Sequence, residues 1–150
     1  MSLYDKIKES NFKGLSMELV RKYAVQILSS LETLKDHFIV HCDLKPENIL
    51  IKDKEKDTIK LIDFGSSCFE NKTLYLYIQS RFYRAPEVIL EVPYTSAIDM
   101  WSFACILCEL YTGLPIFPGK STNEQIALIM EVNGLPPLEL LQVLISILIT

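Results

Sequence analysis

Two short stretches of the sequence gather side chains that could together transfer a phosphoryl group. Asp43 can accept a proton from an attacking hydroxyl, and Lys45 can neutralise a phosphate. Asn48 and Asp63 offer oxygen ligands, which a hard cation such as Mg²⁺ prefers. Phosphoryl transfer depends on such groups because the protein does little covalent chemistry and instead positions the reactants and offsets their charge. We therefore predict Asp43 and Lys45 as catalytic residues, and Asn48 and Asp63 as metal ligands.

These side chains lie within longer motifs. Residues 41–48 read His-Cys-Asp-Leu-Lys-Pro-Glu-Asn, residues 63–65 read Asp-Phe-Gly, and residues 85–87 read Ala-Pro-Glu. In this order they resemble the catalytic loop, the metal-binding loop and the end of the activation segment of protein kinases. Residues 75–84 read Tyr-Leu-Tyr-Ile-Gln-Ser-Arg-Phe-Tyr-Arg, and Cys42 replaces the usual Arg. This pairing resembles the dual-specificity tyrosine-regulated kinase (DYRK) family.

The resemblance continues through residues 98–102 and 113–119 and covers about residues 3–137. It implies an α+β protein-kinase-like fold, of which this chain supplies a mostly helical C-terminal lobe with small β-hairpins. We expect residues 1–137 to form this partial domain and residues 138–150 to form a divergent apolar tail. The sequence contains no Gly-rich loop, no strand lysine of the Val-Ala-Ile-Lys type and no helix with its glutamate partner. Those parts belong to the N-terminal lobe, which we expect to be absent from this chain.

The resemblance also implies an activity. Family members transfer the γ-phosphate of ATP, bound with Mg²⁺, to Ser and Thr hydroxyls of protein substrates, and they phosphorylate themselves on tyrosine. It places Lys45, Asn48 and Asp63 at the ATP site. We expect this chain alone to be weak or inactive. Two alternatives stay open: a truncated, non-catalytic module that binds substrates or competes with a full-length kinase, and a decayed pseudogene product.

Tyr77 is the predicted phosphosite, by resemblance to the second tyrosine of the family's Tyr-x-Tyr. A phosphate there would carry about −1.5 to −2 charges and would suit a bidentate Arg partner. Arg81 and Arg84 are close in sequence and are the expected partners. Cys42 cannot bind a phosphate as Arg would, so any such ordering of the segment must come from elsewhere. The alternative is that Tyr77 is an ordinary aromatic residue on an extended segment.

Three further residues are assigned supporting roles by the resemblance. His41 is expected to pack and to form hydrogen bonds, and not to bind metal, because no second His or Cys lies beside it at a ligand spacing. Asp99 is expected to bond the backbone of the catalytic loop. Glu87 usually pairs with an arginine from later helices, and here its carboxylate is expected to meet water.

Hydrophobic periodicity predicts the elements that position these groups. Ser16 is a suitable N-cap for a long amphipathic helix that carries the catalytic loop. Its apolar face comprises Leu19, Val20, Tyr23, Ala24, Ile27, Leu28, Leu31 and Leu34. A second core helix is predicted to begin at Thr95 or Ser96 and to end at Gly113, and it carries Asp99.

Shorter elements surround these two helices. We predict a helix over residues 3–8, and a β-hairpin whose apolar runs flank the charged turn 53–57. Ser121 or Thr122 is expected to cap one more helix before the Gly-Leu-Pro-Pro at 134–137.

Composition limits the remaining classes. The chain has 150 residues, 49 % of them hydrophobic and 23 % charged, which is typical of a globular unit. Its net charge of −4 provides no basic field for nucleic acid, and the apolar tail is too short to span a membrane. Four cysteines without a disulfide spacing favour the cytoplasm or the nucleus. We expect Cys105 and Cys108 to pack in the core and not to bind metal. The oligomeric state stays open.

Overall fold

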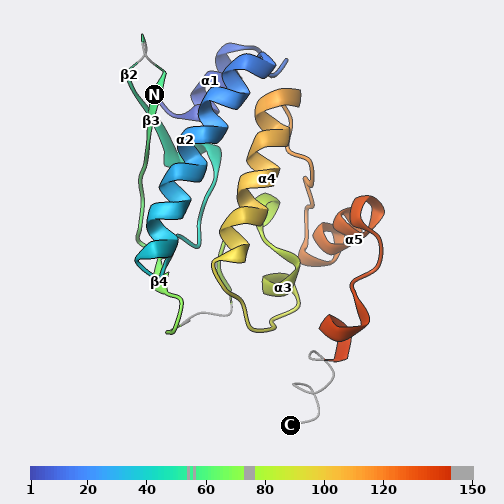
Figure 1. Ribbon diagram of the computed structural model, residues 1–150. Helices are drawn as coiled ribbons and strands as arrows, with labels where there is room; N and C mark the ends of the chain where they lie inside the picture. Colours follow the sequence, from blue (N-terminus) through green and yellow to red (C-terminus); the bar gives the residue numbers. More distant parts are fainter. Residues whose placement is uncertain (54, 56, 73–76, 143–150) are drawn as a thin grey trace.

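The computed structural model describes residues 1–53, 55, 57–72 and 77–142, and Figure 1 shows the arrangement of their helices and strands. The helices are α1 (Leu3–Glu9), α2 (Met17–Asp36), α3 (Pro86–Ile89), α4 (Ala97–Thr112) and α5 (Thr122–Asn133). The strands are β1 (Ile39–Val40), β2 (Ile49–Asp53), β3 (Thr58–Leu61) and β4 (Cys68–Phe69). Helices α2 and α4 lie side by side, the β2–β3 hairpin packs against α2, and α5 lies next to α3. The described residues thus form the predicted mostly helical unit with small antiparallel sheets.

Helix α2 confirms the long helix that the apolar periodicity predicts. The side chain of Ser16 caps it by accepting a hydrogen bond from the backbone N–H of Leu19 at 3.4 Å. The buried residues of the helix are Val20, Tyr23, Ile27 and Leu31. The prediction was wrong for Leu28, which is 40 % exposed. Leu28 borders an open cavity of about 880 Å³ between α2 and the start of α4, and no described segment fills this space.

Helix α4 also follows the prediction, and its two ends have different causes. Gly113 ends it with φ +86°, and a Cβ atom there would lie 2.1 Å from the carbonyl oxygen of Phe12. Only glycine fits such a left-handed conformation against a neighbouring backbone. At the other end Ser96 is the N-cap, but its own side chain makes no cap bond. Instead, Glu70 Oε1 accepts from the Ser96 N–H at 2.7 Å.

The strands bring the two chemical stretches together. The predicted hairpin is β2–β3, with Ile49 opposite Leu61. It leaves the catalytic loop through a short 3₁₀ turn, Pro46–Asn48, and returns just before Asp63. Strand β1 precedes the catalytic loop and pairs antiparallel with β4, which follows the Asp-Phe-Gly turn. The catalytic loop and the Asp-Phe-Gly turn are therefore fixed to each other by both sheets.

Two clusters of buried residues support this arrangement. The main core joins α1, α2, α4 and the hairpin. A smaller cluster lies around the start of the catalytic loop and consists of Val40, Cys42, Cys68, Ile78, Ala85, Val88, Tyr94 and Ile98. The catalytic loop therefore begins inside a core and not on a free surface.

The remaining predictions concern the C-terminal part and the cysteines. Ser121 caps α5 through the N–H of Glu124 at 3.2 Å, as expected. Of the predicted tail, residues 143–150 lie outside the described residues. All four cysteines are free, and Cys105 is buried in the main core. Among the described residues, no group of three or more His, Cys, Asp or Glu could hold a metal ion, and no helix could cross a membrane.

Candidate active site

The carboxylate of Asp99 fixes the backbone at the start of the catalytic loop. Its Oδ2 accepts from the His41 N–H at 2.7 Å, and its Oδ1 accepts from the Cys42 N–H at 3.1 Å. Burial is the larger influence and raises the pKa of Asp99, although these two hydrogen bonds act in the opposite direction. Cys42 has φ +65°, a left-handed conformation that costs a non-glycine residue about 1–2 kcal/mol. Asp99 thus holds a strained turn in place.

The His41 ring links the catalytic loop to the strand that leads to Asp63. The ring is fully buried, and its Nε2 lies 3.1 Å from the carbonyl oxygen of Ile62. Its Nδ1 accepts from the Asp43 N–H at 3.3 Å, which leaves the proton on Nε2 to be donated to Ile62. The ring of Phe64 packs against it, with centroids 4.9 Å apart. His41 therefore packs and forms hydrogen bonds between the catalytic loop and the strand before Asp63.

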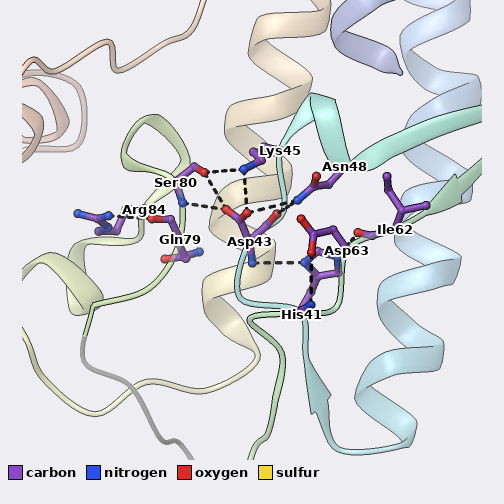
Figure 2. A network of polar contacts seen from close by, with 10 residues as sticks. His41, Asp43, Lys45, Asn48, Ile62, Asp63, Gln79, Ser80 and Arg84 are labelled. Atoms are coloured by element: carbon purple, nitrogen blue, oxygen red, sulfur yellow. Dashed lines mark hydrogen bonds and ion pairs between the residues drawn. The ribbon is translucent and has the colours of Figure 1, made fainter. Parts of the chain in front are cut away.

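Asp43 lies at the centre of the polar network in Figure 2. Lys45 Nζ donates to Asp43 Oδ2 at 2.8 Å and to Ser80 Oγ at 3.0 Å. The backbone N–H and the hydroxyl of Ser80 both donate to Asp43 Oδ1, at 3.0 and 2.8 Å. Burial by itself would raise the pKa of Asp43, but the bonds from Lys45 and Ser80 together hold it below its ordinary value. Asp43 is therefore a carboxylate at neutral pH.

Asn48 contacts this carboxylate, and Asp63 is drawn in the same close-up in Figure 2. The Asn48 Nδ2 donates to the backbone oxygen of Asp43 at 2.8 Å and to its Oδ2 at 3.3 Å, so the amide oxygen of Asn48 stays available. Asp63 is exposed, and within the described ranges its Oδ1 accepts a hydrogen bond from the Gly65 N–H at 3.4 Å.

An amide oxygen and a carboxylate suit Mg²⁺, which takes few protein ligands and completes its octahedron with water and phosphate oxygens. The donor set of Asn48 and Asp63 therefore fits this cation in company with a phosphorylated ligand.

The predicted phosphosite lies beside one of its two predicted partners. Tyr77 is 72 % exposed, and the Arg84 guanidinium lies 4.1 Å from the centre of its ring. A hydrogen bond and the positive charge of Arg84, with a smaller contribution from Arg81, lower the pKa of Tyr77. Arg81 also donates from Nη1 to the carbonyl of Lys120 at 2.9 Å. The other tyrosine of the motif, at position 75, lies outside the described residues.

Glu87 stands in the first turn of α3 and is half-buried. Within the described ranges, neither a hydrogen bond nor an ion pair is found for its carboxylate.

The sequence did not single out Ser80, although its hydroxyl bridges Asp43 and Lys45. A cavity of about 450 Å³ opens beside this bridge, and Glu47 and the buried Glu109 line it. The side chain of Glu109 accepts from Tyr83 Oη at 2.6 Å. The local sequence offers no signal for these contacts, because the partners come from segments 26 to 37 residues apart.

Comparison with known proteins places this geometry in context. The model of the "Protein kinase domain" family matches residues 1–140. Human "dual specificity tyrosine-phosphorylation-regulated kinase 3" is 56 % identical over 142 residues, which are 95 % of this chain and 24 % of that protein. "Dual specificity tyrosine-phosphorylation-regulated kinase 2" of Drosophila melanogaster is 56 % identical over 147 residues, 98 % of this chain and 20 % of that protein. "Probable serine/threonine-protein kinase dyrk2" of Dictyostelium discoideum is 58 % identical over 137 residues, 91 % of this chain and 15 % of that protein. The chain thus spans about a quarter or less of the length of these relatives.

Proposed function

The chain belongs to the protein kinase family and resembles the DYRK kinases, and from this premise we propose the reaction that its catalytic loop performs. In a protein of the relatives' length, the loop transfers the γ-phosphate of ATP to Ser and Thr hydroxyls of protein substrates. The observation that carries this proposal is the Asp43 carboxylate, which Lys45, Ser80 and Asn48 all contact within 3.3 Å. These residues thus hold the Asp43 carboxylate, which can accept a proton, beside the Lys45 ammonium group, which can face a phosphate.

The acceptor hydroxyl of the substrate would donate its hydrogen bond to Asp43. Since the pKa of Asp43 is lowered, the carboxylate is a weak base and receives the proton late, as the new O–P bond makes the hydroxyl acidic. Ser80 and Lys45 keep the carboxylate oriented throughout. The ammonium group of Lys45 also offsets the negative charge of the phosphoryl group in transit.

Asn48 and Asp63 would hold the Mg²⁺ that accompanies ATP. When bound, this cation supplies charge neutralisation at the phosphate oxygens. The protein kinase family in general uses ATP and Mg²⁺. We propose that both serve here, with Lys45, Asn48 and Asp63 as the contacts from this chain. Because the sequence has no Gly-rich loop to cover the phosphates, we propose that this chain alone is weak or inactive.

Three finer assignments belong to the same proposal. Tyr77 is the self-modified residue, with Arg84 and Arg81 as partners of its phosphate, and its exposure beside Arg84 supports this. Residues 1–137 act as the partial kinase domain, followed by the divergent tail. The protein works in the cytoplasm or the nucleus, which its free cysteines support.

Phosphoryl transfer by the longest natural protein that contains these residues tests the proposal. Labelled ATP, Mg²⁺ and a Ser/Thr-containing protein substrate are supplied, and labelled residues are mapped by mass spectrometry. Asp43→Asn should lower the rate by about 10²-fold or more. Glu55→Gln, an exposed turn residue, is the matched control and should leave the rate unchanged. Equal labelling by Asp43→Asn and the unaltered protein would refute the mechanism.

A second candidate is a non-catalytic module that binds protein substrates. It is supported by the cavity of about 450 Å³, which this chain forms by itself beside Lys45. A Ser/Thr-containing peptide that bound the 150-residue chain and its Asp43→Asn variant equally, without phosphoryl transfer by the longer protein, would favour this candidate.

A further inference from the structure

Gln79 is a buried polar residue that the proposed reaction does not use. It lies between Tyr77 and Ser80, and the residue is only 6 % exposed. Its backbone has φ +63°, a left-handed conformation that is uncommon outside glycine, asparagine and aspartate. Such a residue persists only where its surroundings hold it strongly.

The side-chain amide of Gln79 provides that hold, because both of its ends form hydrogen bonds. Its Nε2 donates to the carbonyl of Ile98 at 3.0 Å and to Ser102 Oγ at 2.8 Å. Its Oε1 accepts from the Ala85 N–H at 2.8 Å. Ile98 and Ser102 belong to α4, so the amide connects the activation segment to this helix.

The backbone on either side of this amide contacts the catalytic loop. The Gln79 N–H donates to the carbonyl of Cys42 at 3.0 Å. The next residue, Ser80, donates twice to Asp43 Oδ1 and accepts from Lys45. A change in the backbone of Gln79 therefore moves the groups that orient the Asp43 carboxylate.

Arg84 connects the same backbone to Tyr77, as Figure 2 shows for its bond to Gln79. Its Nε donates to the carbonyl of Ile78 and its Nη2 to the carbonyl of Gln79, both at 2.8 Å. Its guanidinium lies over the Tyr77 ring. A guanidinium has five N–H donors, and the two bonds to backbone carbonyls leave three that can face Tyr77. A phosphate on Tyr77 can therefore take the remaining donors while Arg84 keeps both carbonyls.

We propose that Gln79 is a positioning residue that couples phosphorylation of Tyr77 to the orientation of Asp43. A phosphate on Tyr77 holds Arg84 in place, and Arg84 in turn holds the carbonyls of Ile78 and Gln79. Because the Gln79 amide anchors the same residue to α4, the neighbouring Ser80 keeps its position against Asp43. The inference rests on the proposed role of Tyr77 as the phosphorylated residue. It explains how the loop is ordered although Cys42 cannot bind a phosphate.

Amide hydrogen exchange by NMR tests the coupling without any need for enzymatic activity. The 150-residue chain is prepared with tyrosine or genetically encoded phosphotyrosine at position 77. Phosphotyrosine should slow exchange of the Gln79 and Ser80 amides by about tenfold, the effect of one added charge-assisted hydrogen bond. Because no transfer reaction is measured, failure of the kinase proposal appears only in the labelling assay, and failure of the coupling appears only here.

Two variants remove the amide's contacts to different degrees. Gln79→Glu keeps the acceptor for Ala85 and loses both donors, whereas Ser102→Ala removes one acceptor and keeps the other, at Ile98. In both, the slowing by phosphotyrosine should fall below about twofold. Ile27→Val, a core change in α2 away from this network, is the control and should keep the tenfold effect.

If Gln79 has only a structural role, a different pattern of exchange rates is expected. Its variants would speed exchange equally with and without phosphate, so that the phosphate effect would stay near tenfold. That result would overturn the proposal. So would an unaltered chain in which phosphotyrosine at position 77 leaves the exchange rate of the Ser80 amide unchanged. If Gln79→Glu does not fold, the milder Ser102→Ala decides the question by the same ratio.

Discussion

Asp99→Asn is the substitution that most directly tests how the catalytic loop is held. The carboxylate accepts from two backbone N–H groups, those of His41 and Cys42, at 2.7 and 3.1 Å. The amide of asparagine keeps one acceptor oxygen and turns an NH₂ group towards the other N–H. The loop then loses one charged hydrogen bond and gains a buried, unpaired donor.

The size of the effect follows from two destabilising changes and one stabilising change. A hydrogen bond to a charged group contributes about 1.5–3 kcal/mol, and a buried unpaired donor costs about 1–3 kcal/mol. The substitution also removes a buried charge, whose desolvation raises the pKa of Asp99 and opposes folding. We expect the free energy of unfolding to fall by about 2–4 kcal/mol. For a chain of this length that lowers the melting temperature by roughly 5–15 °C.

The assay combines urea unfolding with amide exchange, so that a local effect can be separated from a global one. The His41 and Cys42 amides should exchange faster in Asp99→Asn than the core amides of α2 do. Asp36→Asn, an exposed residue at the end of α2, is the matched control and should change the free energy by less than about 0.5 kcal/mol. An Asp99→Asn protein with unaltered stability and unaltered His41 exchange would show that Asp99 does not hold the loop.

Three other predictions follow from the contacts of single residues. Glu70→Ala removes the acceptor of the Ser96 N–H, so the free energy of unfolding measured in urea should fall by about 1 kcal/mol, the usual effect of losing a helix cap. Gly113→Ala places a Cβ against the carbonyl of Phe12 at φ +86° and should cost more than about 1 kcal/mol by the same assay, whereas a neutral result would contradict the close approach. The pKa of Asp43 is lowered in the fold, so its ionised form adds stability above its ordinary value of 3.8, and this stability is lost as the pH falls through the folded value. The difference in unfolding free energy between the unaltered chain and Asp43→Asn should therefore be constant near pH 7 and shrink below about pH 4, and a difference that grows there would reverse the assigned sign.

The sequence predicted the elements whose causes are local. Ser16 caps α2 and Gly113 ends α4, because a cap and a left-handed glycine act within one helical turn. The β2–β3 hairpin follows equally from two short apolar runs around a charged turn. The positions of Asp43 and Asn48 followed from a motif that is continuous in the chain.

Contacts between distant segments could not be predicted in this way. The cap of α4 comes from Glu70, 26 residues before Ser96, whereas the sequence pointed only to Thr95 or Ser96 as the start of the helix. Leu28 has the helical spacing of a core residue, yet it faces an open cavity because the neighbouring helix does not cover it. Periodicity identifies an apolar face, whereas its coverage depends on the placement of other elements.

Cys42 shows why the loop does not need an arginine at this position. Its side chain is fully buried in the smaller cluster, and its Sγ lies 3.7 Å from the Sγ of Cys68. Burial raises the pKa of the Cys42 thiol, so it stays a neutral, small apolar group. The loop is held instead through its backbone. The Cys42 N–H donates to Asp99, and the Cys42 carbonyl accepts from the Gln79 N–H. Hydrogen bonds to the backbone survive a change of side chain at that position. The ordering of the loop therefore depends on Asp99 and Gln79, which come from α4 and the activation segment, and not on the residue that occupies position 42.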